Sequence, residues 1–484
     1  MQTRDTLYIG GEWVPPATAN TIEVVSPATE EVIARVPEAS EADVDRAVKA
    51  AEDALHGPYA ELTPDERADL IARLSQAIQA RSQEFADTIT TEMGSPSSWA
   101  LMGQVFSATM VFDAWAELIR TYPFEEIRPG ALGPVLVRKE PVGVAAGIIP
   151  WNVPLFIVAL KLGASLAAGA PMVLKPSPET PLDAYLLGEV LDEIELPKGM
   201  VSILPAGREI GEYLVRHAGV DKVSFTGSTA AGRKVGAACG ELLKKVTLEL
   251  GGKSAAIVLP DVDLPTAVPM LMGNALMNNG EACIAQTRIL APRARYDEVV
   301  DALADAVRNT TVGDPTDPNV AVGPLVAERQ RERVLGYIGK GRDEGAKLAV
   351  GGGRPAGLDR GWYVEPTLFV DVDNTMTIAR EEIFGPVLSV IPYDDEAEAV
   401  RIANDSDYGL SGSVWTADVE HGIEIARQVR TGTYGINQYG TLDMKNPFGG
   451  YKASGVGREL GREGLEEYLE TKSIVLPGDY TPPS

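Results

Sequence analysis

Cysteine and histidine are both scarce in this chain of 484 residues. The two cysteines, Cys239 and Cys283, are too few for a disulfide framework or a cysteine-rich zinc site, and they are typical of a reducing compartment. The three histidines, at positions 56, 217 and 421, lie beside none of the motifs described below. The sequence therefore gives no support to a cysteine–histidine hydrolase, and we expect no metal site.

Long apolar runs and positive charge are also lacking. No stretch reaches about 18 uninterrupted apolar residues, so no transmembrane helix is expected. The N-terminus has no apolar segment of signal-peptide type. With 43 basic and 69 acidic residues the net charge is −26, and an acidic surface repels phosphate backbones and anionic membranes. We therefore expect a cytoplasmic protein that binds neither nucleic acid nor a membrane.

Short apolar segments alternate with helical ones from about residue 135, which is typical of βαβ units and a parallel sheet. One series ends at Val223–Phe225 and a second runs from about 254 to 440, so we predict two α/β domains. The expected strands are Val144–Ile149, Met172–Leu174, Val201–Leu204, Val223–Phe225, Ala255–Leu259, Arg288–Leu290, Leu348–Val350 and Val387–Ile391. The expected helices are 155–168, 181–194, 208–217, 296–308, 324–344 and 395–404.

The flanking segments give further expectations. A hairpin turns at Gly10-Gly11, and helices are predicted over 41–56 and 64–92. The piece 121–141 is punctuated by proline and glycine and should be an extended arm, while Ser473–Leu476 should be a short strand.

Two motifs contain candidate reactive groups. Cys283 follows the turn-prone run Asn278-Asn279-Gly280, although a free cysteine taken alone is more often a small buried hydrophobe. Glu249 lies between two leucines and before two glycines. Apolar surroundings raise a carboxyl pKa and suit a general base, but a strand-end glutamate facing water fits equally well.

Two further motifs could bind anions. Asn152 lies between two prolines in PWNVP, where its amide could donate to an oxyanion or form an Asx-turn. In FTGST, a strand runs into a helix start that could face a pyrophosphate or could be an ordinary N-cap. The run Gly351–Ala356 fits the loose pattern G-x-G-x-x-A, but glycine-rich sequence and not a helix follows it, which favours a surface loop.

Seven motifs stand in a fixed order: PWNVP, KPSPET, FTGST, LELGGKS, GEACIAQTR, EEIFGPV and PFGGYKASGVGRELG. Over nearly its whole length the chain resembles the NAD(P)-dependent, hydrolytic aldehyde dehydrogenase superfamily. The resemblance implies an α/β fold with a Rossmann-like cofactor domain (1–120 and 142–250), an α/β catalytic domain (251–453) and a small β oligomerisation arm (121–141 and 469–484). That family lacks the GxGxxG fingerprint, as this chain does.

The resemblance implies a catalytic set. Cys283 is the nucleophile, Asn152 and the Cys283 backbone amide form the oxyanion hole, and Glu249 is the base for hydrolysis. Lys161 and Glu459 correspond to the proton-relay positions. The implied reaction oxidises an aldehyde to the acid through a thiohemiacetal and a thioester on Cys283.

The resemblance also implies a cofactor site. Lys175 and Gln330 would contact the adenosine-side ribose, and Glu382 and Phe384 the nicotinamide end. The other cofactor residues would be Ile148, Ile149, Pro150, Trp151, Glu179, Gly207, Gly211, Phe225, Thr226, Gly227, Ser228 and Leu250. Pro178 stands where many NAD-preferring relatives carry an acid, although Glu179 follows it, so we favour NAD and keep NADP as an alternative.

The implied substrate funnel is apolar, lined by Val153, Ile157, Leu160, Ile284, Leu442 and Phe448. Relatives that act on succinic semialdehyde have arginine where this chain has Leu160, so we expect an uncharged, hydrophobic aldehyde. A homo-oligomer, dimer or tetramer, is implied. The family commonly has glutamine at Glu281; this carboxylate could raise the pKa of Cys283, but we favour its pointing away.

Other classes remain open. A Cys-Glu-Lys amidase or nitrilase-like hydrolase would act without nicotinamide, and a non-catalytic structural relative would fail to bind it. A third alternative is a relative that transfers the acyl group to coenzyme A. The presence of Glu249 favours hydrolysis of the acyl group by water instead.

Overall fold

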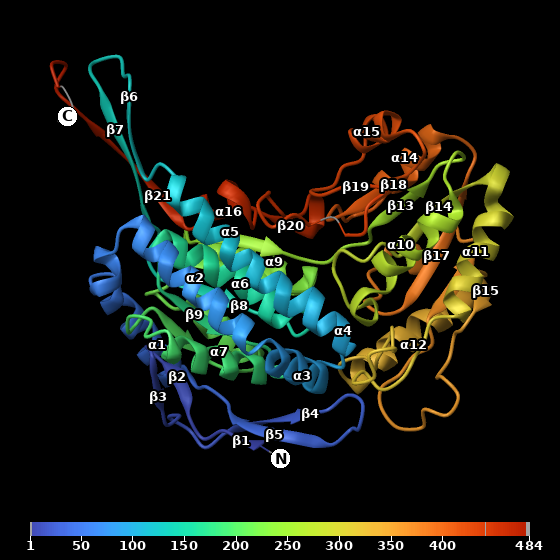
Figure 1. Cartoon of the computed structure of the whole chain (residues 1–484), viewed down its shortest axis with the longest axis horizontal. Helices are drawn as coiled ribbons and strands as arrows, with labels where there is room; N and C mark the ends of the chain where they lie inside the picture. Colours follow the sequence, from blue (N-terminus) through green and yellow to red (C-terminus); the bar gives the residue numbers. More distant parts are fainter. Residues whose placement is uncertain (1, 441, 481–484) are drawn as a thin grey trace.

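The computed structural model describes residues 2–440 and 442–480 (Figure 1). Within these residues the strands form one eight-stranded, one seven-stranded and two three-stranded sheets. The predicted domain ranges also include residues 1, 441 and 481–484, which lie outside the described residues. None of the described helices is long and apolar enough to cross a membrane.

The eight-stranded sheet has a parallel centre with antiparallel edges, in the order β20-β12-β11-β8-β9-β10-β2-β3. This confirms the predicted βαβ series and the hairpin at Gly10-Gly11. The strands are β2 (Leu7–Ile9), β3 (Glu12–Val14), β8 (Ala145–Ile148), β9 (Met172–Lys175), β10 (Val201–Ile203), β11 (Lys222–Thr226), β12 (Lys245–Glu249) and β20 (Gly455–Val456).

Helices cover both faces of this sheet because successive strand residues point to opposite sides. Ala145 packs in one apolar cluster with α2, α3, α5, α6 and α7, whereas Ala146 packs in another with α1, α8 and α9. These helices are α1 (Glu41–Ala54), α2 (Pro64–Ala80), α3 (Ser82–Met93), α5 (Ser107–Thr121), α6 (Pro154–Ala168), α7 (Leu182–Glu193), α8 (Arg208–Arg216) and α9 (Thr229–Glu241). Shorter pieces are η1 (Pro58–Glu61), α4 (Ser97–Trp99) and the π-helix η2 (Ala100–Phe106).

The prediction of one helix over 64–92 is wrong, because the chain breaks between α2 and α3. Arg81 ends α2 and begins α3 with a φ of −106° and a ψ of 20°. Its guanidinium pairs with Glu84, Glu189 and Glu193 at 2.7–3.0 Å. The break between the two helices thus occurs at a residue that forms ion pairs with α7, which is distant in the sequence.

The seven-stranded sheet has the order β15-β16-β17-β14-β13-β18-β19 and is parallel except for β15. Its strands are β13 (Ala255–Val258), β14 (Arg288–Pro292), β15 (Lys347–Val350), β16 (Thr367–Val370), β17 (Val387–Tyr393), β18 (Gly412–Trp415) and β19 (Gly435–Ile436). Its helices are α10 (Leu264–Leu276), α11 (Tyr296–Arg308), α12 (Glu328–Asp343), α13 (Thr377–Arg380), α14 (Glu396–Asn404) and α15 (Val419–Ala426). The segment 351–361 runs between β15 and β16 as the predicted loop.

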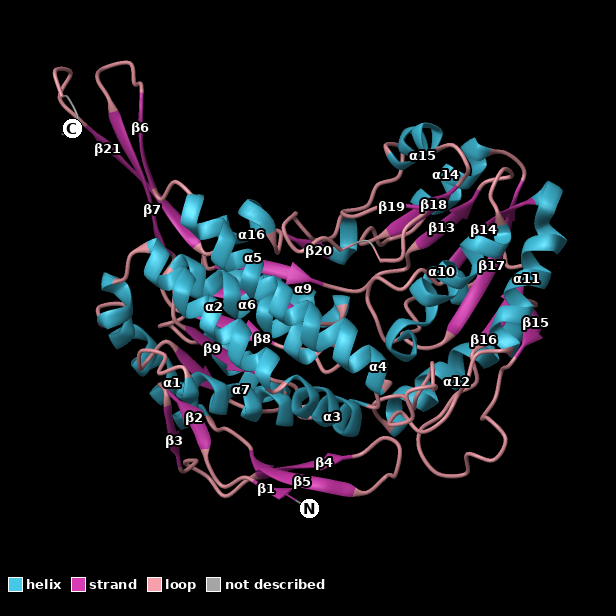
Figure 2. Ribbon diagram, in the orientation of Figure 1, coloured by secondary structure: helices cyan, strands magenta, loops and turns pink. Residues whose placement is uncertain are grey.

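A three-stranded arm projects from the body (Figures 1 and 2). It contains β6 (Glu125–Arg128), β7 (Val135–Pro141) and β21 (Leu469–Val475), which follows α16 (Gly461–Glu466). The predicted strand 473–476 begins earlier because the pairing with β7 starts at Leu469. The sequence did not lead us to expect the other small sheet, β1 (Gln2–Thr3), β4 (Thr21–Val25) and β5 (Val32–Pro37).

Candidate active site

The carboxyl ends of the parallel strands β8 to β12 meet at one edge of the eight-stranded sheet, the usual place for a ligand in an α/β fold. Four predicted segments lie there: Ile148–Val153 at the end of β8 and beyond it, Lys175 at the end of β9, Phe225–Ser228 at the end of β11 and Glu249-Leu250 at the end of β12. Gly207 follows β10 and begins α8, which contains Gly211. Residues far apart in sequence are thus brought to the same edge.

The loop before Cys283 has an unusual backbone. Asn278, Asn279 and Gly280 have φ of 50°, 64° and 74°, in the left-handed region that asparagine and glycine tolerate best. The Asn279 amide donates to the carbonyls of Gly94 and Pro324, at 3.0 Å each. These bonds hold the loop in place, and Cys283 remains partly exposed beyond it.

Asn152 is bound to the same loop. Its Nδ2 donates to the Glu281 carbonyl at 2.9 Å, and the Asn278 amide donates to the Asn152 carbonyl at 2.8 Å. The Asn152 side chain is buried, with 5% exposed. An amide nitrogen carries two N–H donors, so a second one can serve an oxyanion beside Cys283.

Two glycines let neighbouring loops pack closely against the Cys283 loop and against the Glu249 side chain. A Cβ on Gly252 would lie 2.4 Å from the Cys283 carbonyl oxygen, and one on Gly449 would lie 2.8 Å from Glu249 Oε1. Burial raises the pKa of Glu249 well above its usual range, and Glu459 adds to the shift. A buried carboxyl of raised pKa beside a thiol is a candidate general base.

The Cys283 thiol has a pKa well above its ordinary value, although the residue is partly exposed. Burial, helped by the carboxylates of Glu382 and Glu249, raises the pKa of this thiol to about 12. The Glu281 carboxyl has its own partner, because its Oε1 accepts from the Val326 amide at 3.2 Å, and burial raises its pKa well above its usual range. That Glu281 points away from the thiol stays a prediction.

Lys161 and Glu459 form a buried ion pair at 2.6 Å, with 0% and 3% of their side chains exposed. Lys161 Nζ also donates to Ser224 Oγ at 2.9 Å, and this hydroxyl donates to Glu459 Oε1 at 3.3 Å. The predicted relay pair is thus in direct contact and is extended by Ser224, which sequence reasoning missed.

Glu382 and Phe384 lie at the Cys283 side of the edge. Glu382 Oε1 accepts from the Gly252 amide at 2.9 Å, and burial raises the pKa of Glu382 to about 7. Phe384 has a φ of 64° and packs edge-on against Trp151, with ring centroids 5.3 Å apart. Gln330 Nε2 donates to the Phe384 carbonyl at 2.5 Å, so Gln330 also positions this aromatic residue.

Lys175 lies with a second group of predicted residues. Its Nζ donates to the Ala206 carbonyl at 2.6 Å, and burial lowers its pKa to about 8 against the opposing effect of Glu179 and Glu38. Glu38 Oε1 accepts from the Gly207 amide at 3.2 Å. Glu38 follows β5 and lies outside every motif, so no sequence pattern marked it.

Ser228 and Thr226, both predicted to lie near the cofactor phosphates, differ in their hydrogen bonds. Ser228 Oγ accepts from the Ala231 amide at 3.3 Å, so it is the N-cap of α9, the alternative considered above. Thr226 Oγ1 is buried and has no hydrogen-bond partner in the described part of the chain. A buried polar group of this kind needs an explanation, and a polar ligand would supply one. Together with Lys175, Glu179 and Glu382, it fits a dinucleotide.

The predicted substrate residues share one apolar cluster with Cys283. The buried members are Ile157, Leu160, Ile284 and Phe448, and the partly buried ones are Val153 and Leu442. None of the six is charged, so the surroundings of the thiol on this side suit an apolar group.

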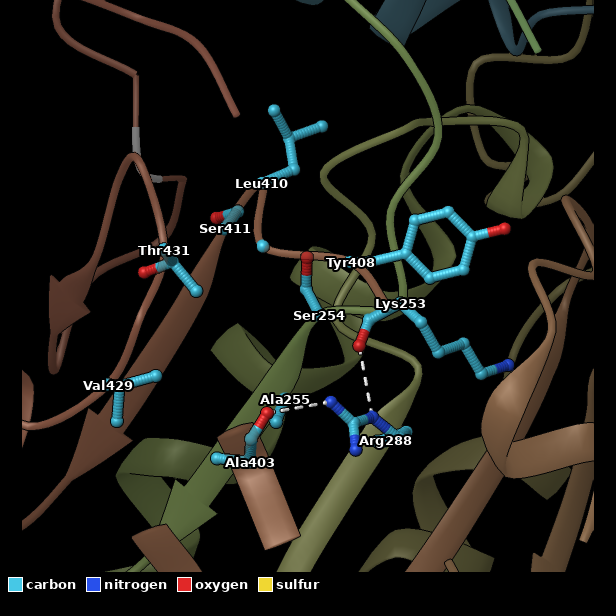
Figure 3. A pocket seen from close by; sticks show the side chains of 11 residues that line it. Lys253, Ser254, Ala255, Arg288, Ala403, Tyr408, Leu410, Ser411, Val429 and Thr431 are labelled. Carbon is cyan, nitrogen blue, oxygen red and sulfur yellow. Dashed lines mark hydrogen bonds between the residues drawn. The ribbon is translucent and has the colours of Figure 1, made fainter. Parts of the chain in front are cut away.

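Arg288, on β14, is hydrogen-bonded to the Lys253 carbonyl, in the loop that follows Glu249 (Figure 3). Its Nε donates to the Lys253 carbonyl at 3.0 Å and its Nη2 to the Ala403 carbonyl at 3.2 Å. This buried guanidinium thus joins the loop that follows Glu249 to the end of α14.

Comparison with known proteins agrees with this geometry. The model of the aldehyde dehydrogenase family matches residues 13–474. The chain is 47% identical to geranial dehydrogenase of Castellaniella defragrans over 98% of both chains. Aldehyde dehydrogenase of Mycobacterium tuberculosis, solved with NAD+, is 50% identical with a TM-score of 0.98, covering 99% of this chain and 100% of that one. A mutant of aldehyde dehydrogenase C from Pseudomonas syringae, solved with NAD+ and octanal, is 42% identical with a TM-score of 0.95, covering 98% of each chain. The chain therefore belongs to the aldehyde dehydrogenase family.

Proposed function

We propose that this protein oxidises an uncharged, hydrophobic aldehyde to its carboxylic acid, with NAD+ as the hydride acceptor. The observation that carries the proposal is the convergence of Cys283, Asn152 and Glu249 at one sheet edge, held by direct contacts between their loops. Segments 1–120 and 142–250 would supply the cofactor domain, and 251–453 the catalytic domain.

Lys175, Glu382 and Phe384 would hold the cofactor, with the remaining predicted residues at the ends of β8 to β12. The bound nicotinamide accepts a hydride, and its positive charge favours the thiolate. NAD is preferred over NADP because Glu38 and Glu179 lie near Lys175 and would repel a 2′-phosphate. Glu179 is itself fixed by Arg329 at 2.5 Å.

The chain's own residues carry the covalent steps. The Cys283 thiol releases its proton to solvent, because the positive nicotinamide would favour the thiolate, and its sulfur bonds to the aldehyde carbon. The resulting oxyanion is stabilised by Asn152 and the Cys283 amide, an effect typically worth roughly 3–4 kcal/mol for one donor. Loss of hydride leaves a thioester, and Glu249 takes a proton from the water that hydrolyses it.

The apolar surroundings of Cys283 support the substrate class. Leu160 is buried, and no charged side chain stands among the six predicted lining residues. The relatives named above for geranial, or solved with octanal, also act on or bind uncharged apolar aldehydes. We therefore expect octanal to be a better substrate than succinic semialdehyde.

We also propose a homo-oligomer in the cytoplasm. The arm of β6, β7 and β21 projects from the body and exposes apolar side chains, including Ile127 at 40% and Val475 at 68%. Exposed apolar strands of this kind suit pairing with a second copy.

Reduced-nicotinamide absorbance tests the function directly. Wild-type protein should reduce NAD+ with octanal, and the Cys283→Ala variant should not. Turnover of amides or nitriles without nicotinamide would favour the hydrolase alternative, and failure to bind NAD+ would favour a non-catalytic relative. A clear preference for succinic semialdehyde would contradict the substrate class, and Leu160→Arg is the variant expected to create that preference.

A further inference from the structure

A line of polar side chains crosses the centre of the eight-stranded sheet on one face. Lys222 and Ser224 share a face of β11, because alternate strand residues point the same way. Thr247 and Glu249 share the same face of β12, since the parallel register pairs Ser224 with Thr247. Central strands of a parallel sheet are normally apolar on both faces, so this line needs an explanation.

We call this line the polar ladder. Lys161 from α6 and residues following β20 complete it. Its members are Glu249, Glu459, Lys161, Ser224, Lys222, Thr247 and Glu467. The inner half, from Glu249 to Ser224, has been described above as the base and the relay pair.

The outer half leads away from Cys283 toward solvent. Lys222 Nζ donates to Thr247 Oγ1 and lies 3.5 Å from Glu467 Oε2. The Thr247 hydroxyl donates to the same oxygen at 3.4 Å. The Lys222 side chain is 0% exposed and that of Glu467 is 28% exposed. The ladder therefore ends on a carboxylate that water reaches.

Tyr468 lies where the two halves meet. Lys222 Nζ lies 5.1 Å from the centroid of its ring. Burial raises the pKa of the Tyr468 phenol, Glu459 and Glu467 add to the shift, and the Ser224 hydroxyl opposes it. The Tyr468 ring thus contacts Lys222, while its hydroxyl has no hydrogen-bond partner within the described residues.

The pKa of Lys222 suits proton transfer. Burial lowers its pKa to about 8, Glu467 and Glu459 oppose the shift, and Lys161 adds to it. A lysine whose pKa lies near neutrality can both accept and release a proton under working conditions. A purely structural lysine could be replaced by an apolar residue without affecting proton transfer.

We propose that Lys222, Thr247 and Glu467 carry to solvent the protons that thioester hydrolysis delivers to Glu249, an inference that rests on the proposed function. In that step the water oxygen bonds to the acyl carbon, and the water proton passes to the Glu249 carboxylate. The carbon–sulfur bond breaks, and its electron pair stays on Cys283 as thiolate. Glu249 must then lose its proton before the next turnover. Lys222 and Glu467 touch no reacting atom; they are positioning residues that act through Lys161 and Glu459.

Glu467→Gln tests the outer half with little change of shape. The matched control is Glu470→Gln, because Glu470 is 55% exposed and pairs with Lys245, at 3.1 Å, outside the ladder. Stopped-flow absorbance with octanal separates the first burst of reduced nicotinamide, before hydrolysis, from steady turnover, which includes it. Thr247→Val and the buried Lys222→Met are measured alongside, and Glu467→Gln decides the question if either fails to fold.

We expect Glu467→Gln to keep its burst and its KM while kcat falls about tenfold, less than the 10²–10⁴ of a direct general base. The solvent deuterium isotope effect on kcat should rise, and concentrated imidazole, reaching the open end of the ladder, should restore part of the rate. Glu470→Gln should match wild type in every measure. The proposal is overturned if Glu467→Gln and Glu470→Gln behave alike in an active enzyme. If wild type itself does not reduce NAD+ with octanal, the proposed function fails instead.

Discussion

We expect alkylation of Cys283 to be slow in the protein without cofactor. Its rate should continue to rise with pH well above the pH at which the alkylation rate of an ordinary cysteine levels off. The cause is the raised pKa of the thiol, about 12, which arises from burial and from the Glu382 and Glu249 carboxylates. A free cysteine has a pKa of about 8.5.

The magnitude follows from these two values. At pH 8 the thiolate fraction is roughly 10⁻⁴ for a pKa of about 12, against about a quarter for an ordinary thiol. The more basic thiolate is intrinsically more reactive, with a Brønsted coefficient of about 0.4–0.5, and this recovers part of the difference. The net expectation is alkylation roughly 50- to 100-fold slower than that of an ordinary cysteine.

The assay uses iodoacetamide, with modification of Cys283 followed by mass spectrometry across a pH series in a Cys239→Ala background. Glu382→Gln should lower the apparent pKa of the thiol, because it removes a carboxylate that raises it. Saturating NAD+ should speed alkylation, since the positive nicotinamide favours thiolate. A rate that already levels off near the ordinary pKa, without cofactor, would refute the electrostatic reasoning.

Three other predictions concern separate parts of the molecule. Asn152→Ala should lower kcat about 10²–10³-fold with the fold intact by circular dichroism, because one oxyanion donor is lost; unchanged kcat would remove Asn152 from the site. Burial raises the pKa of both Asp183 and Glu92, and an acid whose pKa is raised on folding destabilises the fold above its unfolded pKa, about 3.9 for aspartate. Asp183→Asn should therefore raise the Tm at about pH 7–8 and leave it unchanged near pH 4, and a lower Tm at neutral pH would contradict this. Replacing Glu38 and Glu179 together by glutamine should raise kcat/KM with NADP about tenfold or more relative to NAD, and an unchanged ratio would show that neither carboxylate discriminates.

Local patterns in the sequence predicted much of the architecture. The alternation of short apolar strands with helices predicted the parallel strands β8 to β11, and the Gly10-Gly11 hairpin is confirmed. The motifs predicted that Cys283, Asn152 and Glu249 would belong together, and the hydrogen bond from Asn152 to the Cys283 loop agrees. These features depend on residue type and short-range spacing.

Features set by distant contacts could not be predicted in the same way. The break at Arg81 coincides with ion pairs to α7, more than a hundred positions away along the chain. Glu38 reaches Gly207 from a strand that no motif marks. The alternation in β11 and β12 is visible in KVSFT and KVTLE, but which face it would line depended on the sheet order.

For Glu249, too, the sequence predicted one part of the site and only the fold shows the other. The two glycines after Glu249 are visible in the sequence, but the need for glycine at position 252 is visible only in the structure. A Cβ there would lie 2.4 Å from the Cys283 carbonyl oxygen. The raised pKa of Glu249 likewise depends on its burial and on Glu459, which the fold brings from near the C-terminus.

Trapping the acyl-enzyme is the most direct test of the central claim, that Cys283 forms a thioester which Glu249 hydrolyses. The Glu249→Gln variant is mixed with octanal and NAD+, and its intact mass and peptide map are recorded. We predict a single burst of reduced nicotinamide, little further turnover, and an octanoyl group on Cys283. Undiminished steady turnover, or a burst with no acyl group on Cys283, would contradict the account.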